Sequence, residues 1–136
     1  MKEARRALLR FAQRAWVMAV LGVSSPAWAS APQCYPYNGS WYCQYTGPVS
    51  SAYLNASGLI LLYFDAAVDP STLASAGVTG VSQYGGAAYL MTTNPDIAKS
   101  FYASLLAAQG RGVSVTVQME GTVQGYLQII NIWVPQ

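Results

Sequence analysis

Two cysteines placed symmetrically about an Asn-Gly pair constrain the fold of this 136-residue chain more than any other feature. Cys34 and Cys43 are its two cysteines, and Asn38-Gly39 lies midway between them. Asn-Gly is the strongest short signal for a two-residue β-hairpin turn. Counting outward from this turn places Cys34 opposite Cys43 in a non-hydrogen-bonded pair, where side chains approach most closely. The spacing therefore predicts a disulfide-bridged hairpin.

The same register pairs Tyr37 with Ser40, Pro36 with Trp41, and Tyr35 with Tyr42. Pro36 then falls in a non-hydrogen-bonded pair, where its missing N–H costs the ladder nothing. A redox-active dithiol is the alternative, but there is no Cys-X-X-Cys spacing and no nearby cation to lower a thiol pKa. Closing so short a loop should contribute less than about 3 kcal/mol. We therefore expect the bridge to fix the hairpin more than the whole domain.

The first 29 residues have the three parts of a secretory signal peptide. A cationic start is followed by an apolar run from Ala15 to Val23 and by a small-residue exit at Ala27-Trp28-Ala29. A transmembrane anchor is the alternative, but about nine apolar residues are far fewer than the ~20 that a bilayer requires. We expect cleavage near Ala29 and a secreted or periplasmic protein without a membrane span. General and twin-arginine export both stay open.

Few charges remain after residue 29. Two cations stand against four carboxylates, which gives a net charge of −2: Lys99, Arg111, Asp65, Asp69, Asp96 and Glu120. Two cations cannot neutralise a phosphate backbone or an anionic membrane surface, so binding to nucleic acid is not expected. The chain has no histidine, the commonest general base and metal ligand. We expect a non-catalytic protein with no catalytic residue, no metal site and no cofactor.

Beyond the hairpin, the sequence predicts extended segments around one helix. The segments that are apolar or alternating are residues 49–54, 59–64, 80–91, 113–119 and 126–134. The last is apolar on both faces and is expected to be buried, after a turn at 120–125. The helix is predicted from Asn94, a good N-cap, to a stop at Gly110 and Gly112. Residues 69–74 are at most one further helical turn, and Gly85-Gly86 predicts a bulge or a close backbone approach.

Antiparallel neighbours with a single inserted helix predict a mainly β fold with one helix, in the α+β class. We expect a small five-stranded OB-type barrel with the helix between its third and fourth strands. A ferredoxin-like sandwich is less favoured, because it needs two crossover helices. The predicted organisation is a signal peptide at 1–29, a disulfide-bridged hairpin at 30–46 and an OB-like β-barrel domain at 47–136.

Two stretches support a family resemblance. The segment GPVSSAYLNASGLILLY at 47–63 has the pattern of a first long hairpin, and AKSFYASLLAAQGRGVSVTV at 98–117 that of a central helix and the following strand. In this order and spacing, the chain resembles the B subunits of AB5 toxins, particularly the OB-fold subunits like those of subtilase cytotoxin and pertussis-type toxins. The resemblance implies an exported, non-catalytic module that assembles as a homo-oligomeric ring, such as a pentamer, and binds glycans.

Aromatic side chains crowd around the predicted hairpin. The candidate contacts to a ligand or a protein interface are Tyr35, Tyr37, Trp41, Tyr42 and Tyr45. Tyr and Trp combine a flat apolar face with a polar tip, which suits sugar stacking, a protein interface or simple cover for a small barrel. These three interpretations stay open. The alternative function is a monomeric periplasmic or secreted accessory or inhibitor-like protein, which acts by inserting its bridged aromatic hairpin into a partner.

Overall fold

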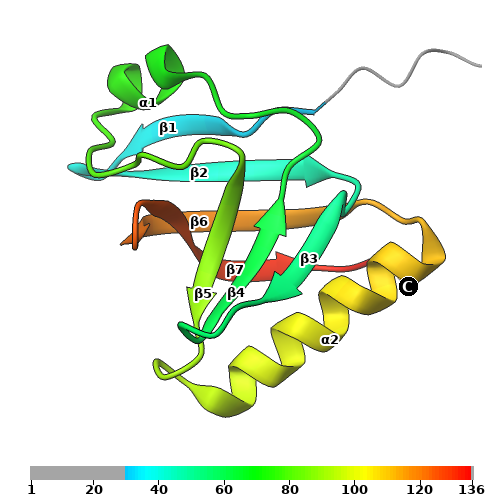
Figure 1. Cartoon of the computed structure of the whole chain (residues 1–136). Coiled ribbons are helices and arrows are strands. Elements are labelled where there is room, and N and C mark those ends of the chain that lie inside the picture. The colour runs from blue at the N-terminus through cyan, green and yellow to red at the C-terminus, as the bar shows by residue number, and fades with distance from the viewer. Residues whose placement is uncertain (1–29, 136) are drawn as a thin grey trace, which may run out of the picture.

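The computed structural model describes residues 30–135, which form one seven-stranded mixed sheet with two helices (Figure 1). The predicted signal peptide lies outside the described residues. In chain order the elements are β1 (Gln33–Tyr37), β2 (Ser40–Gly47), β3 (Ser51–Leu54), β4 (Leu59–Tyr63), α1 (Pro70–Ala76), β5 (Gly86–Leu90), α2 (Pro95–Arg111), β6 (Val115–Val123) and β7 (Tyr126–Trp133). The strand order is β1-β2-β6-β7-β5-β4-β3, with β5 and β7 parallel.

The predicted five-stranded OB-type barrel with one helix is wrong. The sheet has seven strands and is not closed, because β1 and β3 lie at its two edges, and a second helix is present. The hairpin is itself part of this sheet, since β2 pairs with β6 from Cys43↔Met119 to Gly47↔Val115. The parallel pairing of β5 with β7 joins segments separated by α2 and β6, and it sets a strand order that leaves both ends of the sheet unpaired.

The main core lies between two parts of the bent sheet. In Figure 1, β3, β4 and β5 cross in front of β2, β6 and β7. Leu62 of β4 and Val117 of β6 are both fully buried in the same cluster, so side chains from the two parts meet there. The helix α2 adds Ala98, Leu105 and Ala108 to this cluster. Burial of such apolar side chains supplies the dominant favourable term in folding.

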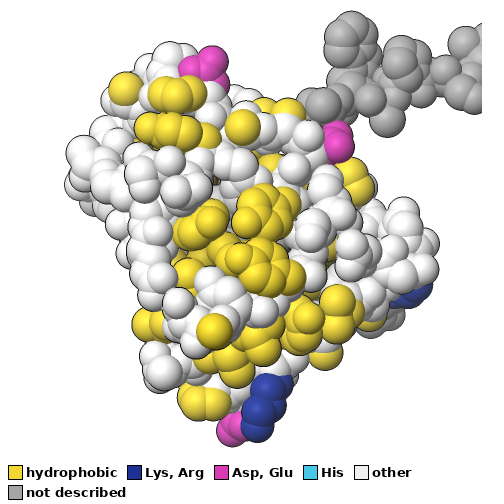
Figure 2. Space-filling view, viewed as in Figure 1, with side chains coloured by type: hydrophobic (Ala, Val, Ile, Leu, Met, Phe, Trp, Pro, Cys, Tyr) yellow, Lys and Arg dark blue, Asp and Glu magenta, His cyan; other side chains and the backbone are white. Residues whose placement is uncertain are grey.

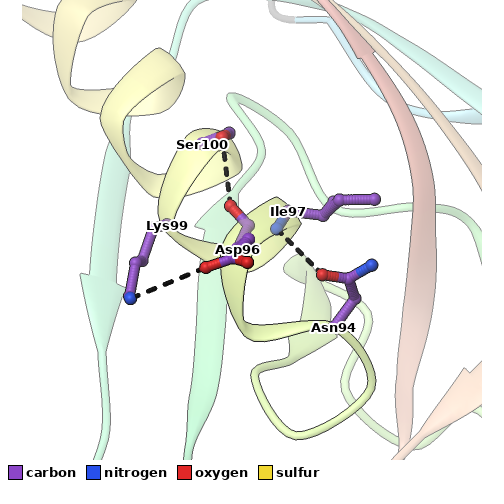
Figure 3. Close-up of polar contacts among 5 residues, drawn as sticks. All are labelled: Asn94, Asp96, Ile97, Lys99 and Ser100. Carbon is purple, nitrogen blue, oxygen red and sulfur yellow. Dashed lines mark hydrogen bonds and ion pairs between the residues drawn. The ribbon is translucent and has the colours of Figure 1, made fainter.

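The predicted helix is confirmed as α2, and its start is fixed by side-chain capping (Figure 3). The Asn94 carboxamide oxygen accepts a hydrogen bond of 3.2 Å from the Ile97 backbone N–H. Asp96 lies in the first turn and pairs with Lys99 at 3.8 Å, with both side chains exposed. Gly112 ends the helix in the left-handed conformation, with φ 64°. Capping of this kind satisfies N–H and C=O groups that a helix end leaves without partners.

The short segment for which the sequence predicts at most one helical turn forms α1, a helix of seven residues. The Asp69 carboxylate accepts a hydrogen bond of 2.7 Å from the Ser71 backbone N–H, and Pro70 occupies the first helical position. Hydrogen bonds from the Ser71 side chain and backbone lower the pKa of Asp69. Leu73 and Ala76 are buried, which anchors this helix on the main core.

The strand boundaries near the end of the chain differ from the prediction. The predicted turn at 120–125 is wrong in length, because β6 runs on to Val123 and only Gln124 and Gly125 turn the chain. Both have positive φ, at 48° and 83°. A two-residue hairpin turn whose twist matches that of its strands requires positive φ at both positions. The ladder between β6 and β7 is irregular near Met119, and this irregularity leaves Ile130 unpaired opposite β6.

Candidate functional site

The predicted hairpin and its disulfide are confirmed. The register between β1 and β2 pairs Tyr35 with Tyr42, and it pairs Cys34 with Cys43. Cys34 and Cys43 are bonded, with their Cα atoms 4.0 Å apart. Asn38 and Gly39 both have positive φ, as the expected turn type demands.

Strand alternation divides the five candidate aromatic residues between the two faces of the sheet. Tyr35 and Tyr42 lie on the outer face, together with Tyr37. Trp41 and Tyr45 share the inner face with Cys43, because side chains two residues apart on a strand point the same way. Trp41 is half-buried and packs against the main core.

Tyr45 is a core residue rather than a surface contact. Its side chain is fully buried, and its ring lies 4.9 Å from that of Phe64, centroid to centroid. Its hydroxyl donates a hydrogen bond to the Pro48 carbonyl oxygen and accepts one from the Asp65 backbone N–H. Burial raises the pKa of Tyr45, although the hydrogen bond from Asp65 acts in the opposite direction.

An open groove of about 430 Å³, the aromatic groove, lies where β1, β2, β6 and β7 meet solvent. Its lining residues are Tyr37, Trp41, Tyr42, Gln44, Gln118, Glu120 and Trp133. Three of the predicted contacts therefore come together in one site. Tyr35 lies beside it, with its ring centroid 5.4 Å from that of Tyr42.

The tyrosines at the hairpin end of the groove present their rings at different angles. The rings of Tyr37 and Tyr42 are nearly perpendicular, at 88°, with centroids 5.9 Å apart. Tyr37 is 61% exposed and Trp133, which β7 contributes, is 51% exposed. Exposing a large aromatic ring to water costs free energy, and such rings are enriched at binding surfaces.

A row of side-chain amides crosses the same face. The register places Gln33 opposite Gln44, Gln44 opposite Gln118, and Gln118 opposite Asn131. The Asn131 amide nitrogen donates a hydrogen bond of 3.0 Å to the Gln118 amide oxygen, which orients both groups. We call these four residues the amide row. The tyrosines lie on one side of it along the strands, and Trp133, which pairs with Thr116, lies on the other.

Sequence reasoning missed four of the groove residues: Gln44, Gln118, Glu120 and Trp133. The strict alternation of apolar and polar residues at 113–119 places Gln118 on the polar face of its strand, but nothing local links this strand to the hairpin. Trp133 was missed because residues 126–134 are apolar on both faces and predicted a buried strand. Its pairing with Thr116 places it on the solvent side instead.

A second aromatic surface lies on the outer face of β3, β4 and β5. Leu59, Leu61 and Ala88 are fully buried there. Tyr63 and Tyr126 are partly buried and pack against these residues. The Tyr53 and Tyr63 rings stack with their centroids 6.1 Å apart. Figure 2 shows hydrophobic side chains gathered in the middle of this view, with the charged ones at its margin. A hydrogen bond with Tyr126 raises the pKa of Tyr63, and burial adds to this rise.

Charged groups are few in the part of the chain that the structure describes. Glu120 is the one charged side chain among the groove residues. No group of three His, Cys, Asp or Glu side chains within residues 30–135 is arranged to hold a metal ion. Neither helix in that range combines the length and the apolar character needed to span a membrane.

The function has to be inferred from this geometry. Searches against protein-family models, curated proteins and solved structures find no match to the chain. The resemblance to AB5 toxin B subunits therefore stays a prediction.

Proposed function

We propose that the protein is an exported, non-catalytic carbohydrate-binding module that holds its ligand in the aromatic groove. One observation carries the proposal: exposed aromatic rings lie on both sides of a row of amides on a single sheet face. A pyranose ring has an apolar face of C–H groups and a rim of hydroxyls. Aromatic rings cover the first, and amides supply both donors and acceptors to the second.

The shape of the groove supports an extended ligand. It is open to solvent, and its lining comes from β2, β6 and β7 together with Tyr37 at the end of β1. A volume of about 430 Å³ lies within the range of ordinary ligand sites. Because the groove is not enclosed, a bound sugar can continue beyond it. An internal stretch of a polysaccharide therefore fits better than a small free metabolite.

The rigidity of the site also supports binding. The disulfide holds β1 to β2, so Tyr35 and Tyr37 are fixed relative to Tyr42. The hydrogen bond between Asn131 and Gln118 fixes part of the amide row. Groups held in place before binding lose less conformational entropy when the ligand arrives.

The proposed export rests on the signal-like sequence and on the disulfide. Structural disulfides persist in secreted and periplasmic proteins and are rare in the reducing cytosol. Mass spectrometry of the protein recovered from a bacterial host tests this step. A chain that begins near Ser30 and carries the bridge is expected, whereas an intact, reduced chain in the cytosol contradicts export.

Screening of the oxidised protein on a glycan array tests the proposed function. We expect binding to a defined class of glycan and a loss of at least tenfold in affinity in Tyr37→Ala, measured by calorimetry. Tyr84→Ala is the matched control, because Tyr84 is also exposed but does not line the groove. Absence of any glycan binding, or equal loss in both variants, rejects the proposal.

A second candidate function is recognition of a protein partner, which includes self-assembly. It is favoured by the exposed side chains of Tyr53 and Leu54 on the edge strand β3. An edge strand offers unpaired backbone groups to another chain. Light scattering separates the versions of this function: a pentamer favours a ring-forming module, and a monomer favours an accessory protein that acts through its hairpin.

A further inference from the structure

Glu120 gives the aromatic groove a negative charge that nothing in its lining balances. The other groove residues are aromatic or carry neutral amides. Glu120 lies on β6, two residues beyond Gln118, and its side chain is exposed. Its carboxylate is therefore available to a ligand that reaches the amide row.

The charges elsewhere on the described residues do not offset Glu120. The two cations there are Lys99 and Arg111, and both belong to α2 rather than to the sheet. Lys99 already pairs with Asp96. An acidic glycan would thus meet a carboxylate in the groove without a cation to bind it.

The aromatic rings of the groove also favour a positively charged ligand. A protonated amine is attracted to the face of an aromatic ring, and more strongly where a carboxylate is also in reach. Tyr37 and Tyr42 both line the groove, with nearly perpendicular rings whose centroids are 5.9 Å apart. A sugar amine lying between these rings and Glu120 would interact with both.

We infer that the groove selects glycans that carry a protonated amino group over neutral glycans, and neutral over acidic ones. This inference rests on the proposed carbohydrate binding and names its ligand class. A polymer of 2-amino-2-deoxy sugars has the required chemistry, because each residue presents an amine, hydroxyls and an apolar ring face.

Three oligosaccharides of equal length test the inference by calorimetry in mildly acidic buffer. They are a glucosamine oligomer, its fully N-acetylated form and a uronic acid oligomer. We expect the exported protein to bind the first about fivefold more tightly than the second, and the third most weakly. The preference for the amine should fall between about 20 and 500 mM salt, since screening weakens exposed charge pairs.

Glu120→Gln keeps the side-chain size and removes the charge. In this variant the affinity ratio between the glucosamine oligomer and the N-acetylated oligomer should approach one. Asp96→Asn removes an exposed carboxylate on α2 and should leave the ratio as in the unaltered protein. The inference is overturned if the unaltered protein shows no preference, or if the preference survives in Glu120→Gln.

These outcomes are distinct from failure of the proposed function. Binding of the N-acetylated oligomer without any amine preference upholds carbohydrate binding and rejects the charge selection. Absence of binding to every oligosaccharide, on the array as well as in solution, rejects both.

Discussion

The hydroxyl of Tyr45 donates a hydrogen bond of 2.6 Å to the carbonyl oxygen of Pro48 in the loop after β2. The same oxygen accepts a hydrogen bond of 3.2 Å from the backbone N–H of Asp65, which follows β4. One buried phenol thus joins the ends of two strands that are distant in the sheet order. This role differs from that of the neighbouring tyrosines, which lie on the solvent face.

We predict that Tyr45→Phe lowers the free energy of unfolding by about 1–3 kcal/mol. The substitution keeps the ring but leaves the Pro48 carbonyl and the Asp65 N–H without their partner. Urea denaturation followed by circular dichroism measures the change. Tyr84→Phe, which alters an exposed ring, should change the unfolding free energy by less than about 0.5 kcal/mol. Equal effects of the two substitutions would contradict this assignment of Tyr45.

The same phenol makes stability depend on alkaline pH. Burial raises the pKa of Tyr45 above the ordinary value of 10.0, so the folded protein keeps a proton that the unfolded chain releases. This stabilisation is complete below about pH 10 and is lost as the pH rises through the folded-state pKa. Urea titrations on both sides of pH 10 should show a steeper fall for the unaltered protein than for Tyr45→Phe. Parallel curves would show that Tyr45 does not contribute.

The local elements could be predicted from the sequence because their signals are local. The Asn-Gly turn determined the register that pairs Cys34 with Cys43, and the cap at Asn94 marked the start of α2. The burial of Tyr45 could also have been predicted from the sequence. Tyr45 is two residues from Cys43, and the alternation of side chains puts both on the same, buried face.

The architecture could not be read in this way. Whether the strands close a barrel depends on which ones pair, and β5 pairs with β7 across a helix and a strand. Hydrophobic periodicity shows which face of a strand is buried but not which strand lies beside it. The groove could not be predicted for the same reason. Tyr42, Gln118 and Trp133 share a site only because β2, β6 and β7 are neighbours in the sheet.

The pair Gly85-Gly86 was predicted to mark a bulge or a close backbone approach, and the structure shows a close approach at one of them. A Cβ atom on Gly86 would lie 2.7 Å from the Leu62 carbonyl oxygen of the neighbouring strand, whereas one on Gly85 would meet nothing within 4 Å. We predict that Gly86→Ala destabilises the protein by about 1–3 kcal/mol, since the backbone of β4 has to shift. Gly85→Ala is the matched control and should have little effect in the same urea titration.

The disulfide should stabilise the fold modestly. The bridge closes a short loop, because its two cysteines are nine positions apart in the sequence, so its removal in a Cys34→Ala, Cys43→Ala variant should cost about 2–3 kcal/mol. The variant should still fold, because β2 stays paired with β6. Thermal unfolding with and without reductant measures the cost in both proteins. Complete unfolding of the variant would show that the whole domain depends on the bridge. An unchanged unfolding temperature would show that the bridge does not stabilise the fold.

Trp133 offers the most direct readout of the groove. After residue 29 the chain has two tryptophans, Trp41 and Trp133, and both line the groove, but Trp41 also packs on the main core. We predict that a bound glycan shifts or quenches tryptophan fluorescence and that Trp133→Ala abolishes most of this change. The substitution should weaken binding at least tenfold, because it removes the aromatic face on one side of the amide row. Its free energy of unfolding should stay near that of the unaltered protein, since half of the side chain is exposed. A variant that binds normally would place the ligand away from β7, while a variant that loses stability as well as binding would mean that Trp133 supports the sheet.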